Sequence, residues 1–117
     1  MGLYGWGPTL YSRLALLAGY GARDGSMSES VRNNGALNRF ELDVDGHQAF
    51  AYYRLTPGVI TFVHTEVPQA LAGQGVGSKL IRGALEMVRA QGLKVVPQCP
   101  FVWAYMGKHP EYNDLLR

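Results

Sequence analysis

The sequence has a single cysteine, Cys99, and only 17% of its residues are charged. One cysteine excludes an internal disulfide framework and is typical of a reducing compartment, so we expect a cytoplasmic protein. No histidines and cysteines occur together at the spacing of a zinc site, so we expect no metal. The net charge of +2 is too small to indicate a nucleic-acid partner, and the apolar runs are too short to cross a membrane.

What the sequence does contain is enough apolar residues for one core. Its length of 117 residues and its hydrophobic fraction of 47% are typical of one globular domain, and a monomer is compatible with this size. The first 26 residues differ from the rest, with six glycines and three charges, and they end just before Met27. We therefore expect residues 1–26 to be an artificial or disordered leader and residues 27–117 to be the compact domain. A natural N-terminal extension is the alternative.

Alternating apolar and polar residues predict three strands in the first half of this domain. Residues 39–44 alternate as a half-buried strand does, and Asp45-Gly46 is a hairpin-turn signal that predicts a partner strand over 47–55. Pro57-Gly58 indicates the next turn, and residues 59–67 are rich in β-branched residues. The first half is therefore expected to be an antiparallel meander.

From about residue 76 the apolar period becomes that of a helix. The expected buried face consists of Val76, Leu80, Ile81, Ala84, Leu85 and Val88. Gln91-Gly92 is a typical helix end, residues 93–96 read as a short buried strand, and residues 101–108 as a short aromatic helix. Residues 111–116 are expected to add a last turn or to fray. The predicted order is βββαβα, an α/β (α+β) fold in which helices pack on a mixed, mostly antiparallel sheet.

Residues 73–80, Gly-Gln-Gly-Val-Gly-Ser-Lys-Leu, join the third predicted strand to the first predicted helix. Glycine lets the backbone approach a ligand, and the first N–H groups of a helix lack intrahelical partners and carry partial positive charge. The segment therefore predicts a phosphate or pyrophosphate site, with a simple tight connection as the alternative. It does not fit a Walker A loop, because Ser78 precedes Lys79, nor the spacing of a dinucleotide fingerprint.

Five segments together resemble the smallest, single-domain (YjdJ-type) members of the GNAT acetyltransferase superfamily. In chain order they are Arg39-Phe40-Glu41-Leu42, His64-Thr65-Glu66-Val67-Pro68, Gly73-Gln74-Gly75-Val76-Gly77, Pro97-Gln98-Cys99-Pro100-Phe101-Val102 and His109-Pro110-Glu111-Tyr112. The resemblance extends from about residue 38 to 115. It implies a GNAT-like fold, acetyl-CoA as the cosubstrate, and transfer of the acetyl group to an amine of a protein or of a small molecule.

The resemblance also implies how acetyl-CoA is held. The superfamily pattern Arg/Gln-x-x-Gly-x-Gly/Ala falls on residues 72–77, where Ala72 replaces the usual Arg or Gln. The pyrophosphate contacts are then expected from the backbone N–H groups of Gly73, Gln74, Gly75, Val76 and Gly77, with the Ser78 hydroxyl added. The pantetheine arm is expected between residues 62–67, which include Val67, and residues 93–99. Lys79 and Arg82 are candidates for the 3′-phosphate of CoA, or else belong to a solvated helix face.

Acetyl transfer needs a base for the amine and an acid for the departing thiolate. Glu66 is the superfamily-like base, and His64, two residues before it on the same strand face, could do the same work. The alternative for this pair is structural: a hydrogen-bonded sheet histidine, and a glutamate paired with a nearby Arg or Lys. Tyr105 is the candidate acid by analogy with a superfamily tyrosine, and core packing is its alternative.

Cys99 adds a second possible chemistry. It lies between two prolines where the fourth predicted strand ends, and it could be a nucleophile that forms an acetyl-cysteine. This role needs a thiolate, which the positive end of the helix expected from Phe101 would favour. The alternative is a small buried hydrophobe. The leading hypothesis is thus an N-acetyltransferase, with a non-catalytic acyl-CoA-binding or sensing module as the alternative.

Overall fold

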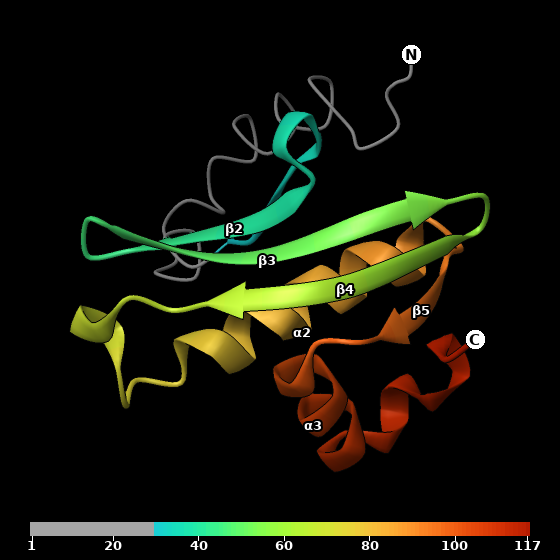
Figure 1. Cartoon of the computed structure of the whole chain (residues 1–117). Coiled ribbons are helices and arrows are strands. Elements are labelled where there is room, and N and C mark those ends of the chain that lie inside the picture. The colour runs from blue at the N-terminus through green and yellow to red at the C-terminus, as the bar shows by residue number, and fades with distance from the viewer. Residues whose placement is uncertain (1–29) are drawn as a thin grey trace, which may run out of the picture.

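Five strands form one sheet with two α-helices packed on it in the described part of the chain, residues 30–117 of this computed structural model (Figure 1). The expectation for residues 1–26 lies outside the described residues. The strands are β1 (Arg32–Asn34), β2 (Arg39–Val44), β3 (His47–Thr56), β4 (Val59–Glu66) and β5 (Lys94–Pro97). The α-helices are α2 (Val76–Ala90) and α3 (Pro100–Lys108), and the 3-10 helices are η3 (Gly35–Leu37), η4 (Gln69–Leu71) and η5 (Pro110–Leu115).

The sheet runs in the order β1-β2-β3-β4-β5, antiparallel from β1 to β4, with β5 parallel to β4. The mixed, mostly antiparallel fold class is therefore confirmed. The predicted order βββαβα is also present, and the structure adds β1 before it. β1 could not be found by periodicity, because its sequence Arg-Asn-Asn has no apolar face.

Both predicted turns form for the expected backbone reason. Asp45 and Gly46 have φ angles of 49° and 79°, the left-handed pair that matches the twist of a two-residue hairpin. Pro57 fixes the start of the next turn, and Gly58 accepts a φ of 75° after it. These turns hold β2, β3 and β4 in register, so that each strand presents its apolar positions to the same face.

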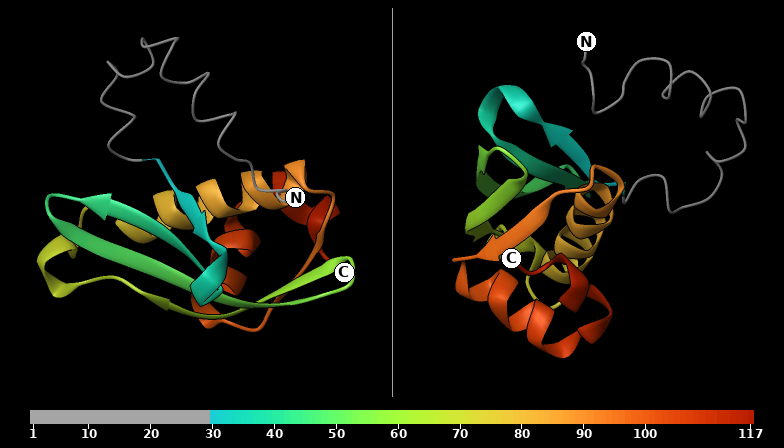
Figure 2. Two further views of the ribbon diagram at one scale, coloured as in Figure 1. Left: turned by 90° about the horizontal axis from the view of Figure 1, so that it is seen from above. Right: turned by 90° about the vertical axis from the view of Figure 1, so that its right-hand side faces the viewer.

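That apolar face is covered by the helices (Figure 2). α2 lies across β2 and β3, and α3 lies against β4 and β5. The six positions predicted for the buried face of the first helix are all buried: Val76, Leu80, Ile81, Ala84, Leu85 and Val88. They pack on the alternating strand positions Phe40, Leu42, Ala49, Ala51, Tyr53, Ile60 and Phe62. No helix among residues 30–117 is long and apolar enough to cross a membrane.

Candidate active site

The glycine loop ends in an uncapped helix N-terminus. Leu71 in η4 is buried and anchors the loop, after which Gly73 and Gly75 take left-handed φ angles of 79° and 73°. Gly75 is the N-cap of α2 and provides no side-chain hydrogen bond, and the first helical bond runs from the Lys79 N–H to the Gly75 carbonyl. The N–H groups before Lys79 therefore have no intrahelical acceptor, as at any helix start.

β4 and β5 separate beside this loop. Their parallel pairing begins at Val59 and Lys94 and ends at Phe62 and Pro97, although β4 continues to Glu66. One further bond, from the Cys99 N–H to the Phe62 carbonyl (2.9 Å), closes the ladder. Along the rest of β4 the backbone facing β5 has no strand partner among residues 30–117. Unpaired strand backbone is what an extended, amide-containing ligand can bind.

A β-bulge in β4 sets which side chains lie at this separation. Tyr52 pairs with His64 while Tyr53 pairs with Phe62, so Val63 is an extra residue. A bulge shifts the alternation of side chains by one residue. As a result Phe62 lies in the core, whereas His64 and Glu66 lie on the opposite face of the sheet.

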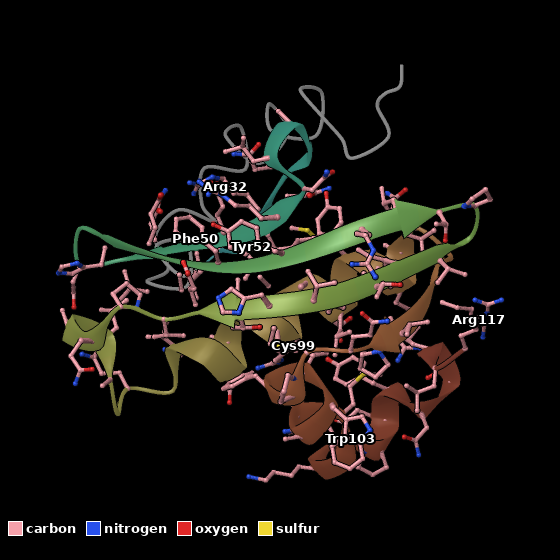
Figure 3. The ribbon with its side chains drawn as sticks, viewed as in Figure 1. Arg32, Phe50, Tyr52, Cys99, Trp103 and Arg117 are labelled. Carbon is pink, nitrogen blue, oxygen red and sulfur yellow. The ribbon has the colours of Figure 1, made fainter. Side chains whose placement is uncertain are left out.

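His64 and Glu66 contact one another on this open face. The distance from His64 Nε2 to Glu66 Oε2 is 3.3 Å, and the two side chains are 58% and 56% exposed. The ring of Tyr52 stacks on His64 with centroids 6.0 Å apart, and Phe50 pairs with Glu66 across the strands. Figure 3 shows Phe50 and Tyr52 on the side of the sheet turned away from α2. The carboxylate thus has a histidine partner rather than an Arg or Lys.

Cys99 lies on the other side of β4, at the start of α3 (Figure 3). It is the N-cap residue of that helix and is buried, and its Sγ lies 3.4 Å from the Oγ1 of Thr65. Pro100 begins the helix, where its fixed φ and missing N–H suit the first turn. The thiol is therefore held at a helix N-terminus beside the unpaired part of β4.

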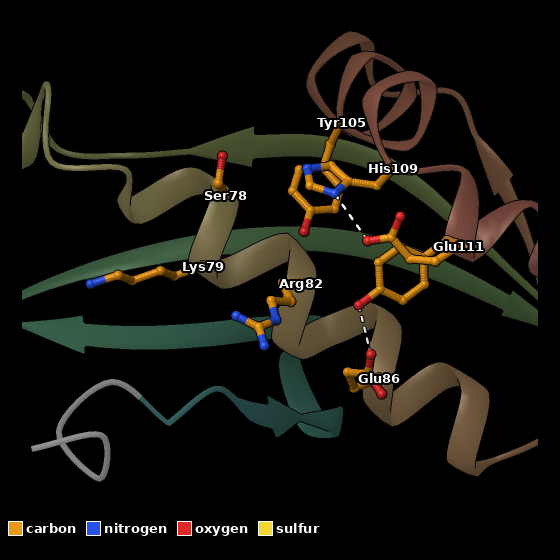
Figure 4. A pocket seen from close by; sticks show the side chains of 8 residues that line it. Ser78, Lys79, Arg82, Glu86, Tyr105, His109 and Glu111 are labelled. Carbon is orange, nitrogen blue, oxygen red and sulfur yellow. Dashed lines mark hydrogen bonds and ion pairs between the residues drawn. The ribbon is translucent and has the colours of Figure 1, made fainter. Parts of the chain in front are cut away.

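Tyr105 lies further along α3, in a groove between α2, α3 and η5 (Figure 4). The groove has a volume of about 560 Å³ and is lined by Ser78, Lys79, Arg82, Glu86, Tyr105, His109, Glu111 and Tyr112. Burial raises the pKa of Tyr105, whose phenol, like that of an exposed tyrosine, carries its proton at neutral pH. Its ring stacks on His109 with centroids 4.1 Å apart.

The acidic groups in this groove have partners of their own. The Tyr112 hydroxyl donates to Glu86 at 2.6 Å, and His109 Nδ1 lies 3.1 Å from Glu111 Oε2. Burial, followed by this hydrogen bond to Glu86, raises the pKa of Tyr112. Arg82 and Lys79 supply positive charge next to Ser78 at the start of α2, and Glu86 and Glu111 supply negative charge in the same groove. The groove therefore adjoins the glycine loop and carries charges of both signs.

The structure thus sorts the predicted residues into three places. His64 and Glu66 form one pair on the open face, Cys99 contacts Thr65 at the separation of β4 and β5, and Tyr105 lines the groove with Ser78. Val67 follows β4 directly and is partly buried against the core. No hydrogen bond or ring contact within residues 30–117 joins these three groups to one another. The same part of the chain holds no cluster of three or more potential metal ligands.

Sequence reasoning missed two residues next to the site. Thr65 was noted only as part of a motif, and nothing in its neighbours signals a contact with Cys99 34 positions later. The alternation of residues 39–44 puts Glu41 on the polar face of its strand with Arg39 and Asp43, yet it is 3% exposed. Arg32, Asn34 and Arg39 all donate to its carboxylate. A polar residue at a strand's outer position becomes buried when charged neighbours cover it, and periodicity carries no such signal.

Comparison with known proteins identifies the family to which this arrangement belongs. A family profile described as GCN5-related N-acetyl-transferase matches residues 39–115. The chain belongs to the GCN5-related N-acetyltransferase family. The matched residues begin with β2 and end with η5, so they include the glycine loop and the separated strands.

Individual proteins are also similar to this chain. The chain is 31% identical over 81 residues to Protein NATD1 of Mus musculus and 30% identical to Protein NATD1 of Homo sapiens. Each match covers 69% of this chain. The chain spans just under two thirds of the length of each relative, 66% of the mouse protein and 65% of the human one. The solution structure of a GCN5-like protein from Staphylococcus aureus superposes with a TM-score of 0.60 at 29% identity, covering 77% of this chain and 89% of that one.

Proposed function

We propose that this protein is an acetyl-CoA-dependent N-acetyltransferase. The observation that carries the proposal is the uncapped N-terminus of α2 behind Gly73 and Gly75, placed beside the point where β4 and β5 separate. The residues present fit acetyl-CoA: the open N–H groups and Ser78 suit a pyrophosphate, and Lys79 suits the 3′-phosphate. The unpaired backbone of β4, with Val67, suits the amides of the pantetheine arm.

When bound, acetyl-CoA supplies an activated acetyl group as its thioester. The side chains of this protein then accept and donate protons. Glu66 is the proposed base that takes a proton from the acceptor amine, directly or through water, and His64 shares or relays that proton at 3.3 Å. Tyr105 is the proposed acid, because a phenol carries its proton at neutral pH and can donate it to the CoA thiolate.

Cys99 gives the proposal a second route. Its thiolate would attack the thioester carbonyl carbon, a new S–C bond would form on Cys99, and CoA would leave as its thiol after protonation. The acceptor amine would then attack the acetyl-cysteine, release the Cys99 sulfur and lose its own proton to the base. The helix N-terminus behind Cys99 and the Thr65 hydroxyl at 3.4 Å are the groups that would stabilise a thiolate.

Two measurements test the function. Calorimetric titration with acetyl-CoA is expected to show binding, and labelled acetyl-CoA offered with a panel of amines is expected to give labelled product. No binding would overturn the proposal. Intact-mass measurement of the protein after exposure to acetyl-CoA separates the routes, since only the Cys99 route adds an acetyl group that Cys99→Ala abolishes.

A non-catalytic acyl-CoA-binding or sensing module is the second candidate. It is favoured by the exposure of His64 and Glu66, whose side chains are each more than half exposed, because exposed side chains do not enclose an acceptor amine. It predicts acetyl-CoA binding without transfer to any amine of the panel. Transfer that is lost in Glu66→Gln would exclude it.

A further inference from the structure

The ring of Phe101 lies against the glycine loop from the side of α3. A Cβ added to Gly77 would stand 2.6 Å from the Cζ of Phe101 and 3.1 Å and 3.2 Å from its two Cε atoms. Gly77 is buried in the first turn of α2, and Phe101 is in the first turn of α3. The ring therefore fills the space that an alanine side chain would take.

This contact links the two ends of the proposed acyl-CoA site. Gly77 belongs to the turn whose N–H groups face the anion, and Phe101 follows two residues after Cys99, at the separation of β4 and β5. Phe101 is 40% exposed, and the covered part of its surface includes the contact with Gly77. The glycine loop and the Cys99 end of α3 thus meet through a ring-to-backbone contact.

We propose that Phe101 is a positioning residue for acyl-CoA, holding the glycine loop at a fixed distance from the start of α3. This inference rests on the proposed function. The superfamily pattern accepts Gly or Ala at the position of Gly77, but in this chain the ring of Phe101 makes glycine the fitting residue. A ligand that spans both ends, from pyrophosphate to thioester, should be sensitive to this contact, whereas a ligand without pyrophosphate should not.

The test compares Phe101→Leu, Gly77→Ala and the double variant in calorimetric titrations with acetyl-CoA and NMR titrations with S-acetylpantetheine. Each single change is expected to raise the Kd for acetyl-CoA by about tenfold, which corresponds to about 1.4 kcal/mol of binding free energy. The double variant should match Phe101→Leu alone, because leucine leaves room for the alanine Cβ. The Kd for S-acetylpantetheine, which lacks the pyrophosphate, should stay unchanged.

Matched controls separate this role from general loss of structure. Trp103→Leu removes another aromatic ring of α3, one that is 67% exposed, and Gly107→Ala places a Cβ of the same helix in open space. Both should bind acetyl-CoA as the wild type does. Circular dichroism reports folding, and if Gly77→Ala does not fold, Phe101→Leu with the two ligands still decides the matter.

Three results would overturn the positioning role while leaving the proposed function intact. They are wild-type affinity in Phe101→Leu, losses that add in the double variant, and equal losses for acetyl-CoA and S-acetylpantetheine. A wild-type protein that does not bind acetyl-CoA would instead overturn the proposed function, and the positioning role with it.

Discussion

Glu41 is a buried residue whose contribution to stability comes from its charge rather than from apolar contact. Its carboxylate receives hydrogen bonds from Arg32, Asn34 and Arg39 at 2.7 to 2.9 Å. Burial alone would raise the pKa of Glu41, but the hydrogen bonds from Arg39 and Asn34 and the charge of Arg32 lower it overall. A buried carboxylate of this kind stabilises the fold only while it is ionised.

We therefore expect Glu41→Gln to reduce the free energy of unfolding at pH 7 by about 2 kcal/mol, the scale of hydrogen bonds to a charged group. Because the pKa of Glu41 is lower in the folded protein than its ordinary value of 4.5, its contribution is complete above pH 4.5 and is lost as the pH falls through the folded value. Urea unfolding at pH 7 and at pH 3 measures this, and the difference between wild type and variant should shrink at pH 3.

Asp43→Asn is the matched control for this prediction. Asp43 also pairs with Arg32, but its side chain is half exposed, so the loss should stay below about 1 kcal/mol. A Glu41→Gln protein as stable as the wild type at pH 7 would contradict the role assigned to the buried carboxylate.

Glu66 carries the residue-scale prediction for activity. If it is the base, Glu66→Gln should lower kcat on the order of a hundredfold, as removal of a general base does, while the Kd for acetyl-CoA stays unchanged. Steady-state rates at saturating acetyl-CoA, with calorimetry alongside, measure the two quantities. Asp45→Asn is the control, because it removes a carboxylate from a hairpin turn whose left-handed backbone Asn also suits. An unchanged kcat in Glu66→Gln would assign the base elsewhere.

Residues of the core could be predicted from the sequence, whereas residues that depend on a distant partner could not. The buried positions of α2 followed from the helical period, since each faces the sheet at a fixed spacing. Burial of Glu41 depends on Arg32 and Asn34 in β1, and the contact of Thr65 with Cys99 depends on where α3 begins. Such pairs are set by tertiary packing, which the local sequence pattern does not indicate.

At the scale of elements, the glycine loop offers a matched pair of positions. Gly75 at the start of α2 and Gly58 in the turn between β3 and β4 have φ angles of 73° and 75°, and a Cβ at either would meet open space. Alanine at either position should cost about 1 kcal/mol of stability, the penalty of a left-handed backbone. The two positions differ in the element to which they belong: Gly75 is the N-cap of α2, whereas Gly58 lies in a turn between two strands.

We expect Gly75→Ala to weaken acetyl-CoA binding and Gly58→Ala to leave it unchanged. A Cβ at Gly75 projects from the backbone that would hold the pyrophosphate, and the strained backbone would turn the N–H groups of the first turn away from it. Thermal unfolding should show similar losses in both variants, and calorimetry should separate them. Equal affinities in the two variants would indicate that the loop is only a connection.

Elements with a local signal were predicted nearly residue by residue. β2 has its predicted bounds, and β3, β4, β5, α2 and α3 begin and end at or next to the expected residues, because turns and glycines fix their ends. β1 and the bulge at Val63 were not predicted. The bulge decides the face on which His64 and Glu66 lie, so the face of the proposed base could be known only from the strand register.

At the scale of the whole molecule, the domain should be complete without its first 26 residues. Among residues 30–117 the buried members of the hydrophobic core lie between positions 40 and 115, and β1 begins at Arg32. A protein of residues 27–117 is therefore expected to unfold at the same temperature as the full chain and to bind acetyl-CoA with the same Kd. Calorimetry of both proteins measures each quantity, and a loss of either would show that the first 26 residues belong to the domain.

A second truncation tests whether the domain needs β1. A protein of residues 35–117 lacks β1, and Glu41 then keeps only Arg39 of its three hydrogen-bonding partners. Removing partners from a buried charge costs about 3 kcal/mol, so this protein should unfold at clearly lower denaturant concentration than residues 27–117. Glu41→Gln introduced into both truncations should destabilise the longer one more, because the shorter one has already lost most of what that carboxylate stabilises. Equal effects of Glu41→Gln in the two proteins would mean that β1 stabilises the sheet through its backbone alone.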